Sequence, residues 1–305
     1  MALSIHTNYS SLITQTNLTK TNNALGTNQQ RLGTGYRINS AADDAAGLQI
    51  ATRLNAQSRG IDVAIRNTND AVSMLQTAEG AFQEMTDIMQ RMKDLATQAA
   101  NDTNSADDRT ALQSEYDELA KELYNIVANT KYAGASLFAA DDGKIDGDAG
   151  KFGATAAGVV FQIGASSSET LTVDISTTLK TLIGATSGGI GKVSGIFTAL
   201  AADPTATLTA GNQLANNTNA GTAITDLTAL LDTIGTLRAN LGANINRLNH
   251  TANNLSNMKD NTDSAKGRIL DADFAKESAN MTKNSMLLQS GISMLKQAGQ
   301  MPSMV

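Results

Sequence analysis

The chain has 305 residues, with 23 Lys and Arg against 29 Asp and Glu, and therefore a formal net charge of −6. Aromatic residues make up only 4%, and the chain contains no Trp and no Cys. So few large rings argue against an ordinary compact globular core. The missing Cys excludes disulfides, thiolate metal sites and cysteine nucleophiles within the chain. An acidic balance without a Lys/Arg cluster argues against general binding of nucleic acid or anionic membranes.

The beginning of the chain, Met1 to Tyr9, has neither the basic nor the apolar segment of a cleavable signal peptide. No apolar run approaches the roughly 18 residues of a transmembrane helix. We therefore expect a soluble protein that does not follow Sec-type secretion.

The two ends of the chain are similar in character. Residues 3–32 are rich in Asn, Thr and Gln and carry a thin apolar stripe, and residues 270–305 carry another. Thin amphipathic helices of this kind bury little surface alone, so we expect them to become ordered only against partners. This pattern points to assembly.

Three longer segments between the ends are predicted to be helical. Apolar residues recur at spacings of three, four or seven from Ile61 to Ala99, and a second helix begins near Ser105, after the polar cluster 101–104. A third segment runs over 224–255 as a coiled-coil seam, with Leu231 in the stripe and Arg238 as its one interruption. Helices of about 40 residues are about 60 Å long, so these segments predict a helical rod.

The middle of the chain differs from its flanks. Of the 25 Gly, 13 lie between Asp141 and Gly221, where charged residues are sparse. We interpret this part as short strands and turns, with a β-hairpin formed by 159–163 and 170–175.

Two motifs carry a family resemblance. The segment from Arg31 to Ala51, RLGTGYRINSAADDAAGLQIA, closely resembles the N-terminal signature of bacterial flagellins. Gly267 to Met281, GRILDADFAKESANM, is similar to their C-terminal signature, with Gly267 in place of the usual Ser. The segment FQIG at 161–164 resembles the flagellin hairpin strand, and the compact middle is similar to the short flagellins of lateral filaments.

The resemblance implies a mainly α fold: a long antiparallel helical hairpin or coiled-coil rod with a small β-hairpin region and a short outer insert. Residues 1–40 and 270–305 would form the D0 terminal coiled coil. Residues 41–175 and 222–269 would form the D1 rod, and residues 176–221 a short variable outer segment. The implied function is that of a structural subunit that polymerises into the extracellular filament for motility, without a cofactor.

The resemblance also implies partners. These are further copies of the chain, an export chaperone, the filament cap and the hook-junction proteins, after secretion through the flagellar type III apparatus. Near the D0–D1 junction we expect subunit packing by seven residues: Arg31, Arg37, Asn39, Asp43, Asp44, Arg53 and Arg59. Solvated or intrachain capping roles are the alternative for each of them. The segment 89–98 resembles the motif bound by the vertebrate toll-like receptor for flagellin, which makes Arg91, Leu95 and Glu115 candidate contacts. Axial packing between subunits is the alternative there.

Other functions have weaker support. His6 and His250 are the only histidines, so a His-Glu-x-x-His metalloprotease helix is excluded and we expect no enzyme. The glycine-rich segment 188–192 departs from a phosphate loop, and the acidic segment 141–148 lacks calcium-loop spacing. We interpret both as turns. A hook–filament junction protein of the same superfamily remains the closest alternative.

Overall fold

The computed structural model describes residues 8–139, 144–145, 150–153, 158–183, 189–206 and 208–300. Its contacts divide the chain into two compact units. The terminal unit is drawn from Met1–Arg59 and Met258–Val305, and the central unit is Gly60–Asn257. The helices are α1 (Tyr9–Thr34), α2 (Ala45–Ala99), α3 (Ala106–Asn129), α4 (Gly150–Gly153), α5 (Ser176–Ile183), α6 (Ile190–Val193), α7 (Gly195–Ala202), α8 (Asn217–Leu270) and α9 (Phe274–Gln300). The predicted mainly helical fold is confirmed.

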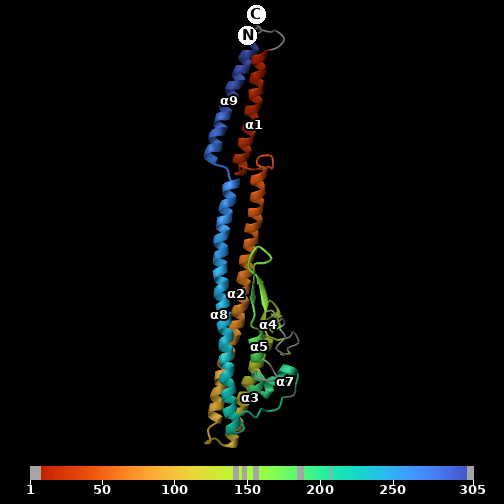
Figure 1. The fold of residues 1–305 in the computed structure, drawn as a ribbon, viewed down its shortest axis with the longest axis vertical. Coiled ribbons are helices and arrows are strands. Elements are labelled where there is room, and N and C mark those ends of the chain that lie inside the picture. The colour runs from red at the N-terminus through yellow and green to blue at the C-terminus, as the bar shows by residue number, and fades with distance from the viewer. Residues whose placement is uncertain are drawn as a thin grey trace. The chain divides into compact units, whose positions relative to one another are not determined.

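In the terminal unit, α1 and α9 lie side by side (Figure 1). They are antiparallel, because Asn8 at the start of α1 donates from Nδ2 to the carbonyl oxygen of Ala298, near the end of α9, at 2.8 Å. The pair buries little: Asn28 is the one buried residue among those of α1. Large apolar side chains remain exposed along both helices, namely Tyr9, Leu12, Ile13, Phe274, Met286, Leu287, Ile292 and Met294. Within the described residues the predicted thin amphipathic ends are the helices α1 and α9, and their ordering against partners stays a prediction.

The break between α1 and α2 lies beside the break between α8 and α9. Helix α1 ends at Gly35, whose φ of 75° is left-handed, as suits a glycine that closes a helix. The Ala272 N–H then donates to the Gly35 carbonyl oxygen at 2.9 Å, and the Arg37 N–H donates to the Leu270 carbonyl oxygen. These two hydrogen bonds hold the α1–α2 connection against the α8–α9 connection.

These helix breaks lie near the predicted D0–D1 boundaries, at 40/41 and 269/270. The contact-based units instead meet inside α2 and α8, at 59/60 and 257/258. The predicted limits lie near the breaks between helices, whereas the two units reflect which residues contact one another. The D0 and D1 limits therefore stay a prediction.

The core of the central unit is built on α2, α3 and α8. The buried face of α2 there follows an alternation of three and four residues, through Ala71, Leu75, Ala78, Phe82, Met85, Met89, Met92, Ala96 and Ala99. The predicted helix is confirmed and is longer at its N-terminal end than the apolar stripe suggested. It pairs antiparallel with α8, since Glu79 accepts from Arg238 at 3.0 Å and Ile61 clusters with Leu255.

The seam of α8 follows the predicted stripe at Leu227, Ile234, Leu241, Leu248 and Leu255 but differs from it at two inward positions. The buried residues are Leu227, Leu230, Ile234, Leu237, Leu241, Leu248 and Leu255, an alternation of three and four that continues in steps of seven. Leu231 is only half-buried, and Arg238 lies beside the seam and binds Glu79. The apparent interruption disappears because Leu230 and Leu237 are the inward positions. Choosing between adjacent leucines requires knowing which side of α8 the rest of the core covers.

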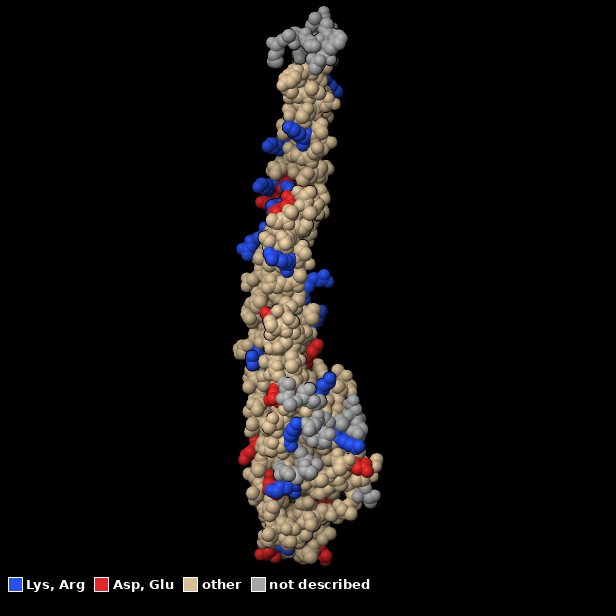
Figure 2. All heavy atoms as spheres, turned by 45° about the vertical axis from the view of Figure 1, so that its right-hand side comes forward, with Lys and Arg blue, Asp and Glu red and all other residues tan. Residues whose placement is uncertain are grey.

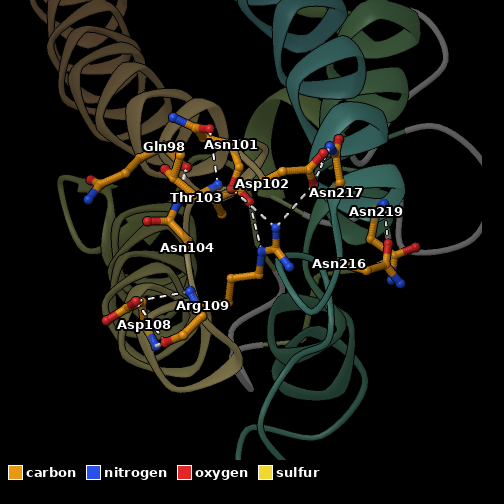
Figure 3. A network of polar contacts seen from close by, with 12 residues as sticks. Gln98, Asn101, Asp102, Thr103, Asn104, Asp108, Arg109, Asn216, Asn217 and Asn219 are labelled. Carbon is orange, nitrogen blue, oxygen red and sulfur yellow. Dashed lines mark hydrogen bonds and ion pairs between the residues drawn. The ribbon is translucent and has the colours of Figure 1, made fainter.

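A polar network closes the end of the central unit where α2 turns into α3 (Figure 3). Arg109 donates from Nε to the carbonyl oxygen of Ala99 at 3.0 Å, which satisfies the end of α2. Asp102 accepts from Asn217 at 3.0 Å, so the turn is also bound to the start of α8. Ser105 caps α3 through a reciprocal capping box with Asp108, so the helix begins where the sequence predicted.

The strands form two small antiparallel sheets. Strands β1 (Lys131–Tyr132) and β2 (Ala135–Ser136) make one, and β3 (Val159–Gln162) and β4 (Thr170–Val173) make the other. In the second sheet Val159 pairs with Val173 and Gln162 with Thr170. The predicted β-hairpin is confirmed.

The interpretation of the segment after the hairpin as strands and turns was wrong. Its described residues form the short helices α5, α6 and α7, and their apolar residues belong to the main core of the central unit. Helix α7 packs on α3, and the Tyr116 hydroxyl donates to the carbonyl oxygen of Val193 at 2.9 Å. Glycine, Ser and Thr lower helix propensity, but burial of residues such as Leu179 and Phe197 stabilises short helices that are marginal alone.

A buried polar clamp fixes the chain that returns to α8. Gln113 on α3 donates to the Asp117 carboxylate at 2.7 Å and accepts from the backbone N–H of Leu214 at 2.7 Å. The other carboxylate oxygen of Asp117 accepts from the N–H of Gly211 at 2.9 Å. A side chain on Gly211 would collide with this clamp, which explains the glycine. The insert is therefore part of the central unit's core.

Candidate assembly interface

An ion pair links α1 and α9 near their break. Nη1 of Arg31 lies 3.2 Å from Oε1 of Glu277, and the Glu277 side chain is 9% exposed. With its amide nitrogen turned toward α9, Asn28 donates to the second carboxylate oxygen of Glu277 at 3.2 Å. A buried carboxylate with two donors fixes the register of the two helices. Within the chain, Arg31 is thus occupied by Glu277.

The two predicted acids at the junction cap the backbone of their own chain. Oδ2 of Asp43 accepts from the backbone N–H groups of Asn39 at 3.0 Å and of Ser40 at 2.9 Å. Asp44 accepts from the N–H of Gly47 at 2.8 Å, as an N-cap residue of α2 does. The side chain of Asn39 donates to the Tyr36 carbonyl oxygen at 2.8 Å. These contacts match the intrachain alternative for all three residues, while packing between subunits remains untested.

The capping of Asp43 predicts a pH dependence. The backbone N–H groups of Ser40 and Asn39 hold the pKa of its carboxyl below the usual value. The folded-state pKa is lower than the unfolded one, so this carboxylate stabilises the loop above about pH 4. That contribution is lost as pH falls through the folded pKa. A carbon-detected NMR titration of the monomer should give Asp43 a midpoint below about 3.9, and Ser40→Ala should leave it below that value. An unshifted midpoint would contradict the capping geometry.

The remaining junction candidates are arginines on the surface. The Arg37 guanidinium donates to the carbonyl oxygen of Ile269 at 2.8 Å and lies 3.8 Å from the Asp44 carboxylate. Arg53 and Arg59 are exposed on α2. The structure therefore separates the seven candidates into five that bind their own chain and two that face outward.

The candidate receptor contacts lie on α2 and α3 of the central unit. Arg91 and Glu115 are exposed and bind each other, with Nε of Arg91 2.9 Å from Oε1 of Glu115. Leu95 is only 1% exposed and belongs to the core. A direct contact through the Leu95 side chain is therefore not available in this conformation. The apolar spacing that marked it is the spacing of the buried seam.

The segments weighed as ligand loops hold no such site where they are described. Lys192 lies in the helical turn α6, which corrects the interpretation of 188–192 as a flexible turn, and it binds Asp226 at 2.7 Å. Most of the acidic segment 141–148 lies outside the described residues. Across the described ranges, no three His, Asp or Glu side chains gather as metal ligands, and no helix is both long and apolar enough to cross a membrane.

Comparison with known proteins gives matches at both ends of the chain. Residues 5–142 match the model of the bacterial flagellin N-terminal helical region, and residues 218–305 match that of the C-terminal helical region. The chain belongs to the bacterial flagellin family. It is 35% identical to Polar flagellin C of Vibrio parahaemolyticus, over 99% of this chain and 98% of the relative. It is 36% identical to Flagellin A of Vibrio cholerae, again over 99% and 98%. A crystal structure of Bacillus cereus flagellin aligns with a TM-score of 0.45 and 30% identity, covering 62% of this chain and 88% of that one.

Membership of the flagellin family makes the chain a subunit of the flagellar filament, which polymerises with its own kind outside the cell. The flagellin models leave residues 143–217 unmatched, and these include α5, α6 and α7. The Vibrio relatives named above are flagellins, so they do not favour the alternative that this chain is a hook–filament junction protein.

Sequence reasoning missed Glu277, Gln113 and Asp117. Glu277 stood within the C-terminal flagellin motif, but nothing in that motif indicates that its carboxylate meets Arg31 across the helix pair. Gln113 and Asp117, four residues apart, share one face of α3, which is a weak signal of a joint role. Only the returning chain shows what they bind.

Proposed function

We propose that this flagellin assembles through the helices of its terminal unit, with the exposed apolar side chains of α1 and α9 buried against neighbouring copies. The supporting observation is that this helix pair leaves many large apolar residues in water, which a helical array can cover. Arg53 and Arg59 face outward and supply polar contacts near the junction. The predicted D0 and D1 limits fit this arrangement, because both helix breaks fall close to them.

Seeded polymerisation tests the proposal. Purified monomer added to filament fragments should extend them, as seen by electron microscopy and by sedimentation. Replacing exposed Met286 and Met294 with Gln should raise the critical concentration by about tenfold or more, because apolar area that assembly buries is lost. Gln at Met258, an exposed residue outside the helix pair, is the matched control and should change it little. Equal polymerisation of both variants would contradict assembly through α1 and α9.

Export unfolded through the flagellar type III apparatus forms the second part of the proposal. A chain without Cys cannot be cross-linked by disulfides on the way out. The export chaperone, the filament cap and the hook-junction proteins are the partners expected at successive stages. Deleting the export apparatus should retain the protein inside the cell, whereas secretion in such a strain would contradict this route.

We further propose that the exposed pair Arg91 and Glu115 is the receptor-facing part of the α2–α3 surface. Both side chains are accessible in the monomer. The double variant Arg91→Ala with Glu115→Ala should lower activation of the vertebrate toll-like receptor by at least about tenfold, because polar contacts at such surfaces are lost together. Lys121→Ala with Glu118→Ala, a neighbouring pair on α3, is the matched control. Unchanged receptor activation by the Arg91→Ala, Glu115→Ala variant would contradict the proposal that these two side chains contact the receptor.

The proposed function is structural and not enzymatic. Support comes from the residue inventory, since the chain has two histidines and no Cys. Hydrolase activity that purified with the filament and disappeared in a point variant would contradict this.

A further inference from the structure

The methionines of this chain differ sharply in exposure. Met286 and Met294 on α9 are 60% and 59% exposed. Four others on α2 are at most 8% exposed and belong to the core of the central unit, namely Met74, Met85, Met89 and Met92. Because the chain has no Cys, thioether sulfur is the group that peroxides oxidise most readily in it. Among the described methionines, Met286 and Met294 are therefore the most accessible targets of oxidation.

The two exposed methionines lie about 12 Å apart along α9, at eight residues' separation. Met294 also borders a groove of about 180 Å³ between α1 and α9, together with Leu18 and Gly291. A side chain at Gly291 would begin 3.1 Å from Leu18, so the glycine lets the two helices approach beside this groove. A water-sized oxidant can thus reach Met294 from the groove as well as from the outer face of α9.

The surface around the α1–α9 pair is mainly uncharged. On the face drawn in Figure 2, this part of the molecule shows scattered Lys and Arg among uncharged residues. Affinity for a neighbouring copy must therefore come largely from apolar contact. Methionine suits such a contact, because its flexible thioether side chain fits irregular apolar surfaces. The same thioether makes the contact sensitive to oxidation.

We infer that Met286 and Met294 are an oxidation-sensitive switch of assembly: as sulfoxides they prevent α9 of a free subunit from packing against neighbouring copies. This inference rests on the proposed assembly through α1 and α9. The oxidant is a peroxide such as hydrogen peroxide. An S–O bond forms as the O–O bond breaks, and the sulfur loses the two electrons that reduce the peroxide. The proton of the transferred oxygen passes to the departing hydroxide, which leaves as water.

The sulfoxide changes polarity without changing charge. Its oxygen is a hydrogen-bond acceptor, and burying it against an apolar surface without a donor is unfavourable. The α2 methionines should escape oxidation, because close packing excludes the oxidant from the core. Neighbouring copies should protect α9 in the same way once the filament has formed. Oxidation therefore acts on subunits before assembly and spares those already assembled.

Peptide mapping by mass spectrometry tests where hydrogen peroxide acts. In the full-length monomer, Met286 and Met294 should form sulfoxides at least about tenfold faster than the four α2 methionines. In assembled filaments the rate at Met286 and Met294 should fall by at least about tenfold. Equal rates at these two residues in monomer and filament would overturn the inference.

Seeded sedimentation tests the effect on assembly. Treatment of the monomer with peroxide, followed by removal of the oxidant, should raise the critical concentration by about tenfold or more. Met286→Leu with Met294→Leu removes both sulfurs and keeps both side chains apolar. Its critical concentration after treatment should equal its own value before treatment. Met258→Leu, at an exposed residue outside the helix pair, is the matched control and should keep the wild-type response.

A double Leu variant that loses assembly on treatment as the wild type does would overturn the inference. Methionine sulfoxide reductases for both epimers, with a thiol reductant, should restore assembly of the treated wild type. A loss that persisted after both sulfoxides had been reduced would also overturn it. The proposed function fails separately: untreated wild-type monomer that does not extend seeds would contradict filament formation, and normal assembly of the untreated Gln variant would contradict assembly through α1 and α9.

Discussion

Phe138→Ala should destabilise the central unit by about 3–5 kcal/mol, the usual cost of removing a buried aromatic ring. The Phe138 ring is 1% exposed and lies between two others, 5.0 Å from Phe82 and 6.2 Å from Phe152 by ring centroids. It joins the turn after β2 to α2 and α4, so a cavity there would loosen three elements together. Urea unfolding of the full chain, followed by near-ultraviolet circular dichroism, measures the loss.

Val160→Ala is the matched control for this variant. Val160 lies on β3 and is 57% exposed, so the free energy of unfolding should change by less than about 0.5 kcal/mol. A loss of under about 1 kcal/mol for Phe138→Ala would show that the aromatic cluster does not hold the unit together.

Glu277→Ala should destabilise the α1–α9 pair by about 2–3 kcal/mol. Removing one partner of a buried ion pair costs about 3–5 kcal/mol, and the 28% exposure of Arg31 lowers this because water can solvate the orphaned guanidinium. The pair has little apolar burial to compensate, so α1 and α9 should become more sensitive to protease and lose helical signal in far-ultraviolet circular dichroism.

Two variants bracket this result. Glu277→Gln keeps hydrogen-bonding capacity without the charge and should give an intermediate loss. Lys283→Ala removes an exposed charge from the same helix and should leave the stability of the pair unchanged. If Glu277→Ala matched Lys283→Ala, the contact with Arg31 would carry no stability.

The sequence predicted the features that depend on local periodicity and on turn chemistry. The stripe of α2, the cap of α3 at Ser105 and the hairpin of β3 and β4 all follow from residues close together in the chain. The two terminal motifs likewise gave the family correctly. For the candidate site, the outward position of Arg53 and Arg59 is what a charged residue opposite an apolar stripe should adopt.

Only the tertiary structure decided the features that depend on a second segment. Leu230 and Leu237 are buried in the core that α8 shares with α2 and α3, and the sequence of α8 alone presents Leu231 almost as well. The Gly-rich segment forms α5, α6 and α7 because the core of the central unit buries their apolar side chains, which outweighs weak helix propensity. Arg31 finds Glu277, and Leu95 is buried instead of exposed, for the same reason. Periodicity and turn chemistry determined the long helices and the hairpin of this chain. Contacts between distant segments determined which faces of those helices are buried and which remain for other copies.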